Sequence, residues 1–194
     1  MSRSSRIERV TTETSITVEL EIDGSGRASV DTGIGFYDHL LTSFAHHALF
    51  DLDLTAKGDL EIDDHHTVED AALALGEAVA AALADRARIT RFGNATVPMD
   101  EALATAAVDI SGRPFATVDL SLRSERIGKL TCQNISHSLE AFTRTSGITL
   151  HLTAGGTNDH HVAEASFKAF ARALMMATAI DQRRQGVPST KGTL

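Results

Sequence analysis

Two closely similar stretches, Asp64-His-His-Thr-Val-Glu-Asp70 and Asp159-His-His-Val-Ala-Glu164, determine how this sequence is interpreted. Each follows a predicted strand and opens an alanine-rich segment of high helix propensity. Residues three and four apart share one face of a helix, so the glutamate of each stretch can lie beside one of its two histidines. The repeated His-His-x-x-Glu motif therefore indicates an internal duplication.

The predicted elements around these motifs have similar orders in the two halves of the chain. In the first half, an alternating strand over residues 6–22 is expected to form a hairpin with a strand over 27–31, through the turn Asp23-Gly-Ser-Gly26. The rest of that half is predicted as a helix over 36–48, a strand over 49–60 and a helix over 67–85. The second half is predicted as strands over 104–110 and 115–122, a helix over 132–145, a strand over 148–153 and a helix over 162–179.

This order predicts an α+β fold, with each half reading strand, strand, helix, strand, helix. The two halves are expected to pack together through their helices. We expect a single domain over residues 1–194, built from repeats of about 6–94 and 95–185. The last residues, 186–194, contain Pro188 and two glycines and are expected to form an extended arm.

The composition limits the classes of protein that need to be considered. Among 194 residues, 42% are hydrophobic and 23% are charged, as in ordinary soluble domains. No apolar run reaches the roughly 18 residues that span a bilayer, and the N-terminus lacks the apolar region of a signal peptide. The single cysteine, Cys132, cannot form an internal disulfide, so we expect a cytoplasmic protein. A net charge of −8 argues against a nucleic-acid partner but permits a small anionic substrate.

The histidines and glutamates of the repeat predict a site for two metal ions. Adjacent histidines on a helix point about 100° apart, so we infer that each His-His pair is divided between two ions. An isolated histidine upstream in each half supplies a third imidazole. The expected ligands, three His and one Glu for each ion, are His39, His65, His66, Glu69, His137, His160, His161 and Glu164. This set leaves open positions for catalysis and suits Zn, Fe, Mn or Ni better than Ca or Mg.

The same residues allow other interpretations. A single His-His-x-x-Glu is explained equally well as a helix N-terminus with a capping acid, but two equivalent copies argue against that interpretation. His151 is expected to be structural, and either His46 or His47 can face the site. A metal-storage protein and a dinuclear metallohydrolase are the competing functions. Storage sites are expected to be rich in oxygen ligands, and dinuclear hydrolases commonly bridge their ions with carboxylates, whereas this set is mostly imidazole.

Further motifs accompany the repeat: Gly33-Ile-Gly-Phe-Tyr-Asp-His-Leu-Leu41, Arg91-Phe-Gly93, Asp109-Ile-Ser-Gly-Arg-Pro114, Phe167-Lys-Ala-Phe-Ala-Arg172 and Ser189-Thr-Lys-Gly192. With them the chain resembles the imidazoleglycerol-phosphate dehydratase family from about residue 6 to the C-terminus. The resemblance implies a hydro-lyase of histidine biosynthesis that converts imidazole glycerol phosphate to imidazole acetol phosphate. It also implies a ribosomal S5 domain 2-like fold with helices between two small sheets, two Mn²⁺ ions per site, and a 24-subunit assembly with sites at subunit interfaces.

The resemblance also assigns roles to individual positions. The eight residues given above match the metal ligands of the family. Its substrate contacts are matched by Glu13, His47, Arg91, Arg113, Lys168, Ser189, Thr190 and Lys191. The chain departs from the family at Gln133-Asn-Ile-Ser136, where relatives are often acidic.

The implied reaction has to remove a proton from a carbon atom without a neighbouring carbonyl, so the imidazole ring of the substrate is the only electron sink. A metal ion on a ring nitrogen would favour the ring anion. A carboxylate, Glu13 or Glu164, would carry the protons. The phosphate needs fixed cations, for which Arg91, Arg113 and Lys191 are the candidates, with Ser189 as a neutral donor.

Overall fold

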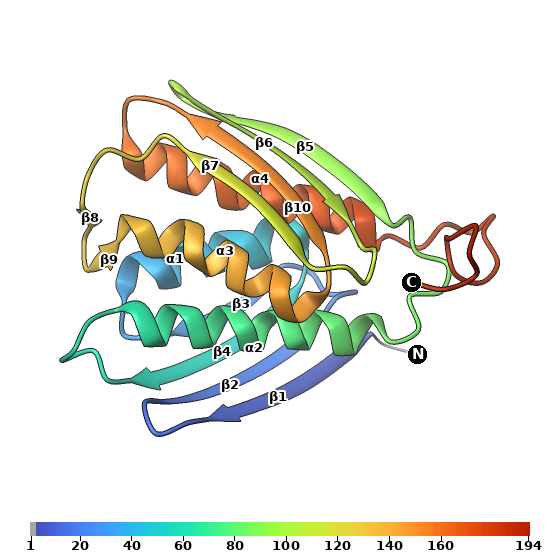
Figure 1. The fold of residues 1–194 in the computed structure, drawn as a ribbon, viewed down its shortest axis with the longest axis horizontal. Coiled ribbons are helices and arrows are strands. Elements are labelled where there is room, and N and C mark those ends of the chain that lie inside the picture. The colour runs from blue at the N-terminus through green and yellow to red at the C-terminus, as the bar shows by residue number, and fades with distance from the viewer. Residues whose placement is uncertain (1–2) are drawn as a thin grey trace.

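The structure of the chain is a computed structural model that describes residues 3–194. Within that range, four helices lie between two four-stranded sheets (Figure 1). The first half contains β1 (Ser4–Val10), β2 (Thr14–Glu21), β3 (Ala28–Asp31), α1 (Gly35–Ala48), β4 (Asp51–Gly58) and α2 (His65–Leu83). The second half contains β5 (Phe92–Met99), β6 (Ala102–Asp109), β7 (Phe115–Leu120), the short hairpin of β8 (Arg126–Ile127) and β9 (Leu130–Thr131), α3 (Cys132–Ser146), β10 (Thr149–Gly155) and α4 (Asp159–Thr178). The predicted α+β class, with helices between two small sheets, is confirmed.

The two sheets have the same topology. Their strand orders are β1-β2-β4-β3 and β5-β6-β10-β7, with β3 parallel to β4 in the first sheet and β7 parallel to β10 in the second. The first half therefore reads strand, strand, strand, helix, strand, helix, with one more strand than predicted. The second half has the same order with the short β8–β9 hairpin added before α3, which gives three more strands than predicted. The predicted hairpin between residues 6–22 and 27–31 is wrong, because β4 lies between β2 and β3. The side chains of β4 alternate between buried and exposed, so it can pair on both edges and still cover the core.

The missed strands have identifiable causes. Residues 6–22 form two strands because the chain reverses at Thr11–Thr14, where the Thr11 hydroxyl accepts hydrogen bonds from the backbone N–H groups of Glu13 and Thr14. This turn contains neither glycine nor proline, so the alternating pattern hides it. Strand β5 contains Gly93 and Pro98, which oppose strand formation, but it lies at a sheet edge, where proline is tolerated. It also extends across the expected repeat boundary at residues 94 and 95.

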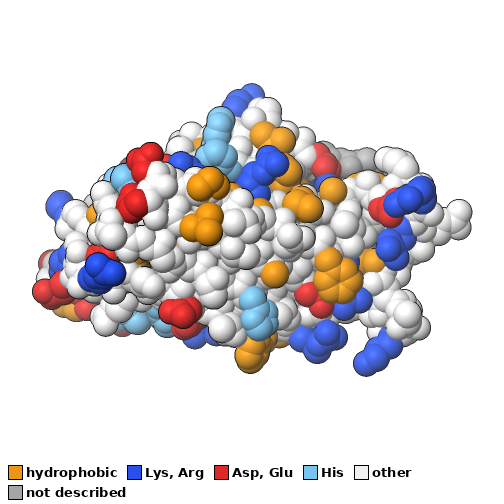
Figure 2. Space-filling view, turned by 90° about the horizontal axis from the view of Figure 1, so that it is seen from above, with side chains coloured by type: hydrophobic (Ala, Val, Ile, Leu, Met, Phe, Trp, Pro, Cys, Tyr) orange, Lys and Arg blue, Asp and Glu red, His pale blue; other side chains and the backbone are white. Residues whose placement is uncertain are grey.

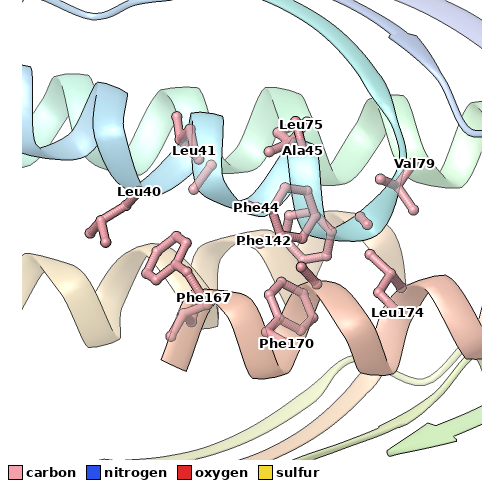
Figure 3. Packing of buried hydrophobic residues seen from close by; sticks show 14 of the residues in the cluster. Leu40, Leu41, Phe44, Ala45, Leu75, Val79, Phe142, Phe167, Phe170 and Leu174 are labelled. Atoms are coloured by element: carbon pink, nitrogen blue, oxygen red, sulfur yellow. The ribbon is translucent and has the colours of Figure 1, made fainter. Parts of the chain in front are cut away.

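The core joins helices of opposite halves. Helix α1 packs on α4, and α2 packs on α3. Between them, the rings of Phe44, Phe142 and Phe170, from α1, α3 and α4, lie with centroids 5.2–6.2 Å apart (Figure 3). Helix α2 adds Leu75 and Val79 to the same cluster. Aromatic pairs at such separations add to the stabilisation that comes from burying their surface.

All four helices begin at the same end of the molecule, and the C-terminal segment lies at the opposite end (Figure 1). That segment is held by two hydrogen bonds: the backbone N–H of Arg88 donates to Gly186 O at 2.8 Å, and Nη1 of Arg91 donates to Pro188 O at 2.9 Å. None of the helices within residues 3–194 is long and apolar enough to cross a membrane.

The close approach of α2 and α3 depends on Gly76. A Cβ atom at this position would lie 2.2 Å from Thr145 Oγ1 and 2.5 Å from the carbonyl oxygen of Phe142. Replacing Gly76 with alanine should therefore push the two helices apart and lower the free energy of unfolding by about 1–3 kcal/mol. Urea unfolding of the EDTA-treated protein measures this loss. Gly35→Ala is the matched control, because a Cβ there meets nothing within 4 Å. Equal stability of the two variants would contradict the stated packing.

Candidate metal centre

The first cluster of candidate ligands lies between α1 and α4. Nε2 of His39 lies 3.1 Å from Oε2 of Glu164, and Nε2 of His160 lies 3.2 Å from the same oxygen. Glu164 is buried, whereas both imidazoles reach solvent. Since His160 and Glu164 are one helical turn apart and His39 approaches from the neighbouring helix, the three donor atoms lie within 4.8 Å of one another.

The second cluster lies between α2 and α3. Nε2 of His65 is 3.4 Å from Oε2 of Glu69, and Nε2 of His137 is 3.3 Å from Oε1 of the same glutamate. The rings of His65 and His137 are stacked, with centroids 4.9 Å apart. Nε2 of His137 is buried and has no hydrogen-bond partner within residues 3–194. A buried imidazole nitrogen beside a carboxylate and a second imidazole fits a divalent metal ion, which would satisfy it.

Each cluster combines ligands from both halves of the chain. His39 of the first half joins His160 and Glu164 of the second, and His137 of the second half joins His65 and Glu69 of the first. The sequence did not show how the ligands divide between two ions. The structure groups six candidate ligands into two separate clusters, through the pairing of α1 with α4 and of α2 with α3.

The second histidine of each pair points elsewhere. The ring planes of His65 and His66 are inclined to each other by 77°, and those of His160 and His161 by 88°. Neither His66 nor His161 belongs to a ligand cluster within residues 3–194. One chain therefore brings together two histidines and one glutamate per cluster rather than the expected three histidines and one glutamate.

The outward-facing histidines are held by carboxylates that sequence reasoning did not identify. Nδ1 of His66 lies 3.0 Å from Oδ2 of Asp59, and Nδ1 of His161 lies 2.8 Å from Oε2 of Glu101. These contacts raise the pKa of both imidazoles, chiefly through the hydrogen bonds to the carboxylates. Asp59 follows β4 and Glu101 lies in the turn between β5 and β6, so no sequence motif links them to the histidines.

The two cluster glutamates remain ionised. Burial alone would raise the pKa of Glu164, but hydrogen bonds from Lys168 and His39 outweigh it and lower the pKa to about 2. Nζ of Lys168 lies 2.7 Å from Oε1 of this glutamate. Glu69 shows the same balance: burial opposes ionisation, but the hydrogen bond from Arg144, together with the charges of His137, Arg144 and His65, outweighs it and lowers the pKa. Both carboxylates are therefore in the form that binds a metal ion.

The first residue of each Asp-His-His motif is structural. Asp64 is buried and accepts hydrogen bonds of 2.6 Å from the backbone N–H and from the hydroxyl of Thr131, immediately before α3. Asp159 accepts from the backbone N–H groups of Arg123 and Ser124, at 3.0 and 2.6 Å. Both aspartates thus tether the segment between β7 and α3 to the helices that carry the histidines.

The expected substrate contacts fall into two groups. Glu13, His47 and Lys168 lie near the clusters: Glu13 is 3.8 Å from Nδ1 of His66, Lys168 contacts Glu164, and the nearby charge of Lys168 adds to the burial that lowers the pKa of His47. His46 is exposed, whereas His47 is half-buried; burial lowers the pKa of His47 most, and Lys168 and Arg172 of α4 are close enough for their charges to lower it further. His151 lies exposed on the outer face of its sheet, beside Phe115.

The second group lies at the other end of the molecule. Arg91 donates to both oxygens of Asp109 and to the carbonyl of Pro188, and its backbone N–H donates to Ala177 near the end of α4. Glu164 is near the start of the same helix, about 20 Å away at about 1.5 Å per residue. Arg113 is 69% exposed beside Asp109. Residues Ser189, Thr190 and Lys191 also belong to this end, so one chain does not bring them to its own clusters.

Comparison with known proteins gives a consistent result. The family model for imidazoleglycerol-phosphate dehydratase matches residues 32–174. The imidazoleglycerol-phosphate dehydratase of Methanocella arvoryzae is 52% identical over 99% of this chain and 100% of its own length, and that of Thermoanaerobacter pseudethanolicus is 53% identical over the same shares. The crystal structure of the Staphylococcus aureus dehydratase has a TM-score of 0.81 at 34% identity, covering 92% of this chain and 99% of that one. The Pyrococcus furiosus enzyme, in complex with (S)-C348, has a TM-score of 0.82 at 36% identity, covering 97% and 100%.

The tether at Asp64 should contribute to stability in a pH-dependent way. Burial opposes its ionisation, but the hydrogen bonds from Thr131 outweigh this and lower its pKa. The contribution is present above the unfolded-state pKa of about 3.9 and is lost as the pH falls through the lower folded-state pKa. Asp64→Asn should therefore cost about 1–3 kcal/mol at pH 7, and the difference from the native chain should shrink below about pH 4.

Urea unfolding of metal-free protein at several pH values measures this difference. Asp63→Asn is the control, since Asp63 is exposed and, within residues 3–194, accepts only from the backbone N–H of His65, as asparagine also can. A loss of stability that did not change with pH would show that the charge of Asp64 is not its cause.

Proposed function

Because the chain belongs to the imidazoleglycerol-phosphate dehydratase family, we propose that its two clusters each hold a divalent metal ion at which imidazole glycerol phosphate loses water to give imidazole acetol phosphate. This is a hydro-lyase reaction of histidine biosynthesis. The observation that carries the proposal is the pair of His-His-Glu clusters at the ends of paired helices. Membership of this family sets aside the metal-storage and metallohydrolase interpretations.

The residues present fit two ions. Each cluster offers two imidazole Nε2 atoms and one ionised carboxylate as ligands. In the second cluster the buried Nε2 of His137 has no hydrogen-bond partner within residues 3–194, and a metal ion would provide one. Mixed imidazole and carboxylate ligands suit first-row transition metals. We propose Mn²⁺ on the strength of the family resemblance, two ions per active site, in a cytoplasmic enzyme.

Each active site is proposed to combine several copies of the chain. His66 and His161 face away from the clusters of their own chain, and they are the imidazoles missing from a set of three histidines and one glutamate. Arg113 and the segment Ser189–Lys191 lie at the other end of the molecule, too far away to reach the clusters of the same chain. Neighbouring copies would supply both. The resemblance gives 24 as the number of subunits.

The charge distribution favours such an assembly. Arginine and lysine side chains gather at the end of the molecule that carries the C-terminal segment (Figure 2). They include Arg86, Arg88, Arg113, Arg184 and Lys191. The opposite end carries Glu13, Asp59, Asp63, Asp100 and Glu101 around the histidines. Exposed Arg123, Arg126 and Lys129 also lie at this end, so the favourable contact is that of these acidic groups with the basic end of another copy.

In this site, bound metal ions would supply Lewis acidity to the substrate's imidazole ring. The remaining chemistry is proton transfer, for which Glu13 and Glu164 were the candidates. Glu164 is engaged by His39, His160 and Lys168, and its pKa of about 2 makes it a poor proton acceptor near neutral pH. Glu13 is 51% exposed, and its only ion-pair contact within residues 3–194 is with Nδ1 of His66, at 3.8 Å. We therefore assign the proton transfer to Glu13 and metal binding to Glu164.

The phosphate is proposed to contact the basic end of a neighbouring copy. The guanidinium of Arg91 is engaged by Asp109 and Pro188, so it also holds the C-terminal segment in place. Arg113, whose contact with Asp109 is long at 4.0 Å, and Lys191 are exposed and are proposed to bind phosphate oxygens, with Ser189 and Thr190 as neutral donors. Near the clusters, His47 and Lys168 are proposed to contact the rest of the substrate.

Removal of the metal should have two effects at once: loss of activity and a smaller assembly. Imidazole ligands from different copies cannot hold those copies together once the ions are gone. EDTA-treated protein should form no imidazole acetol phosphate from imidazole glycerol phosphate and should elute as a smaller particle, and Mn²⁺ should restore both properties. Activity without metal would contradict the proposed metal chemistry. Lost activity with an unchanged particle size would place both sites within single chains.

Replacing Arg113 with alanine should raise KM for imidazole glycerol phosphate about tenfold or more, because a charge-assisted hydrogen bond to the phosphate is lost. Steady-state kinetics on the Mn²⁺-loaded assembly measures the change. Arg183→Ala is the control, since Arg183 is at the same end and 91% exposed, with its guanidinium paired to Asp181. An unchanged KM with intact assembly would remove Arg113 from the phosphate site.

A further inference from the structure

The ligand clusters use one nitrogen of their histidines throughout. In His39, His65, His137 and His160 the nitrogen nearest to the cluster glutamate is Nε2. His65 also shows how that choice is fixed, because its Nδ1 lies 3.3 Å from Oδ1 of Asn134, a buried amide oxygen. An acceptor at Nδ1 places the ring hydrogen there and leaves the lone pair of Nε2 for a metal.

The two outward-facing histidines are arranged in the same way. Nδ1 of His66 faces Asp59 and Nδ1 of His161 faces Glu101. An ionised carboxylate can only accept a hydrogen bond, so Nδ1 must carry the hydrogen and a neutral ring has its lone pair on Nε2. These rings are restrained at one nitrogen while the other is directed away from the chain's own clusters.

We propose that Asp59 and Glu101 are positioning residues: each fixes the tautomer and orientation of an outward-facing histidine, His66 or His161, and so presents its Nε2 to a metal ion held by a neighbouring copy. This inference rests on the proposed function, which makes His66 and His161 ligands. It goes further by assigning a role to two carboxylates that do not touch the ions.

The surroundings of the two carboxylates differ in one respect. Glu101 also accepts from the backbone N–H groups of Thr157 and Asn158 through Oε1, at 3.2 and 2.7 Å, and so braces the start of α4. Asp59 makes no side-chain hydrogen bond within residues 3–194 other than that with His66. A substitution of Asp59 therefore tests the positioning role without disturbing a helix terminus. A substitution of Glu101 tests whether the second half of the chain positions its histidine in the same way.

The experiment is a Mn²⁺ titration of EDTA-treated protein, with unbound Mn²⁺ measured by its electron paramagnetic resonance signal. Asp59→Ala and Glu101→Ala should each weaken binding about 10- to 100-fold at one of the two ions per chain and leave the other unchanged. Asp59→Asn keeps an acceptor oxygen and should recover part of the loss. The controls are Glu61→Gln, an exposed neighbour of Asp59, and Asp100→Asn, whose carboxylate lies 3.9 Å from Nδ1 of His161, beyond hydrogen-bond distance.

A second measurement reports on the tautomer directly. In ¹⁵N-histidine spectra of the metal-free chain, His66 and His161 should carry their hydrogen on Nδ1, and each should lose that preference in its alanine variant. A change in helix stability alone would not produce this signature. Unchanged spectra and unchanged Mn²⁺ affinity in both alanine variants would overturn the inference.

The variants His66→Ala and His161→Ala separate this inference from the proposed function. If both variants bind Mn²⁺ with the same affinity and stoichiometry as the native chain, the proposed ligand set is wrong, and the positioning role is rejected as well. If they lose one ion each while Asp59→Ala and Glu101→Ala do not, the ligands stand and only the positioning role is rejected.

Discussion

The packing of α1 on α4 and of α2 on α3 determines both the core and the candidate metal centre. Each pair joins helices from opposite halves of the chain, and each pair carries one ligand cluster at its start. The spacing of the donors is therefore set by apolar contacts between the paired helices, such as those among Phe44, Phe142 and Phe170. A change in core packing would move a ligand without replacing it, which is why Gly76, between α2 and α3, matters for the site as well as for stability.

The part of the site that follows helical periodicity could be predicted from the sequence. Glutamates four residues after His65 and His160 had to share a helix face with them, and the repetition of the motif made the pattern specific. The partner of each pair could not be predicted, because His39 and His137 reach their clusters through helix pairing across the halves. Helix pairing is a property of the tertiary fold and leaves no signal in the spacing of a sequence.

The supporting residues show a second limit of sequence reasoning. Asp59, Glu101, Asn134 and Arg144 each contact a candidate ligand, yet none belongs to a repeated motif. Three of them contact a histidine or glutamate that is at least 60 residues away in the chain. The strand pairing was missed for a related reason. Alternation predicts that a segment is a strand, but not which neighbours it pairs with, so the parallel pairs β3–β4 and β7–β10 emerged only in the structure.

The common direction of the four helices has an electrostatic consequence. Their peptide dipoles add instead of cancelling, and each helix places about half a positive charge at its N-terminus. The end that carries the histidines would therefore repel a divalent cation if the backbone alone set the potential. Asp38, Asp64 and Asp159 lie in or next to the first turns of three of these helices and oppose that potential. For metal affinity, the position of the acidic residues thus matters more than the net charge of −8. If the same acidic residues lay at the other end of the molecule, the net charge would be unchanged, but the end that carries the histidines would repel a cation.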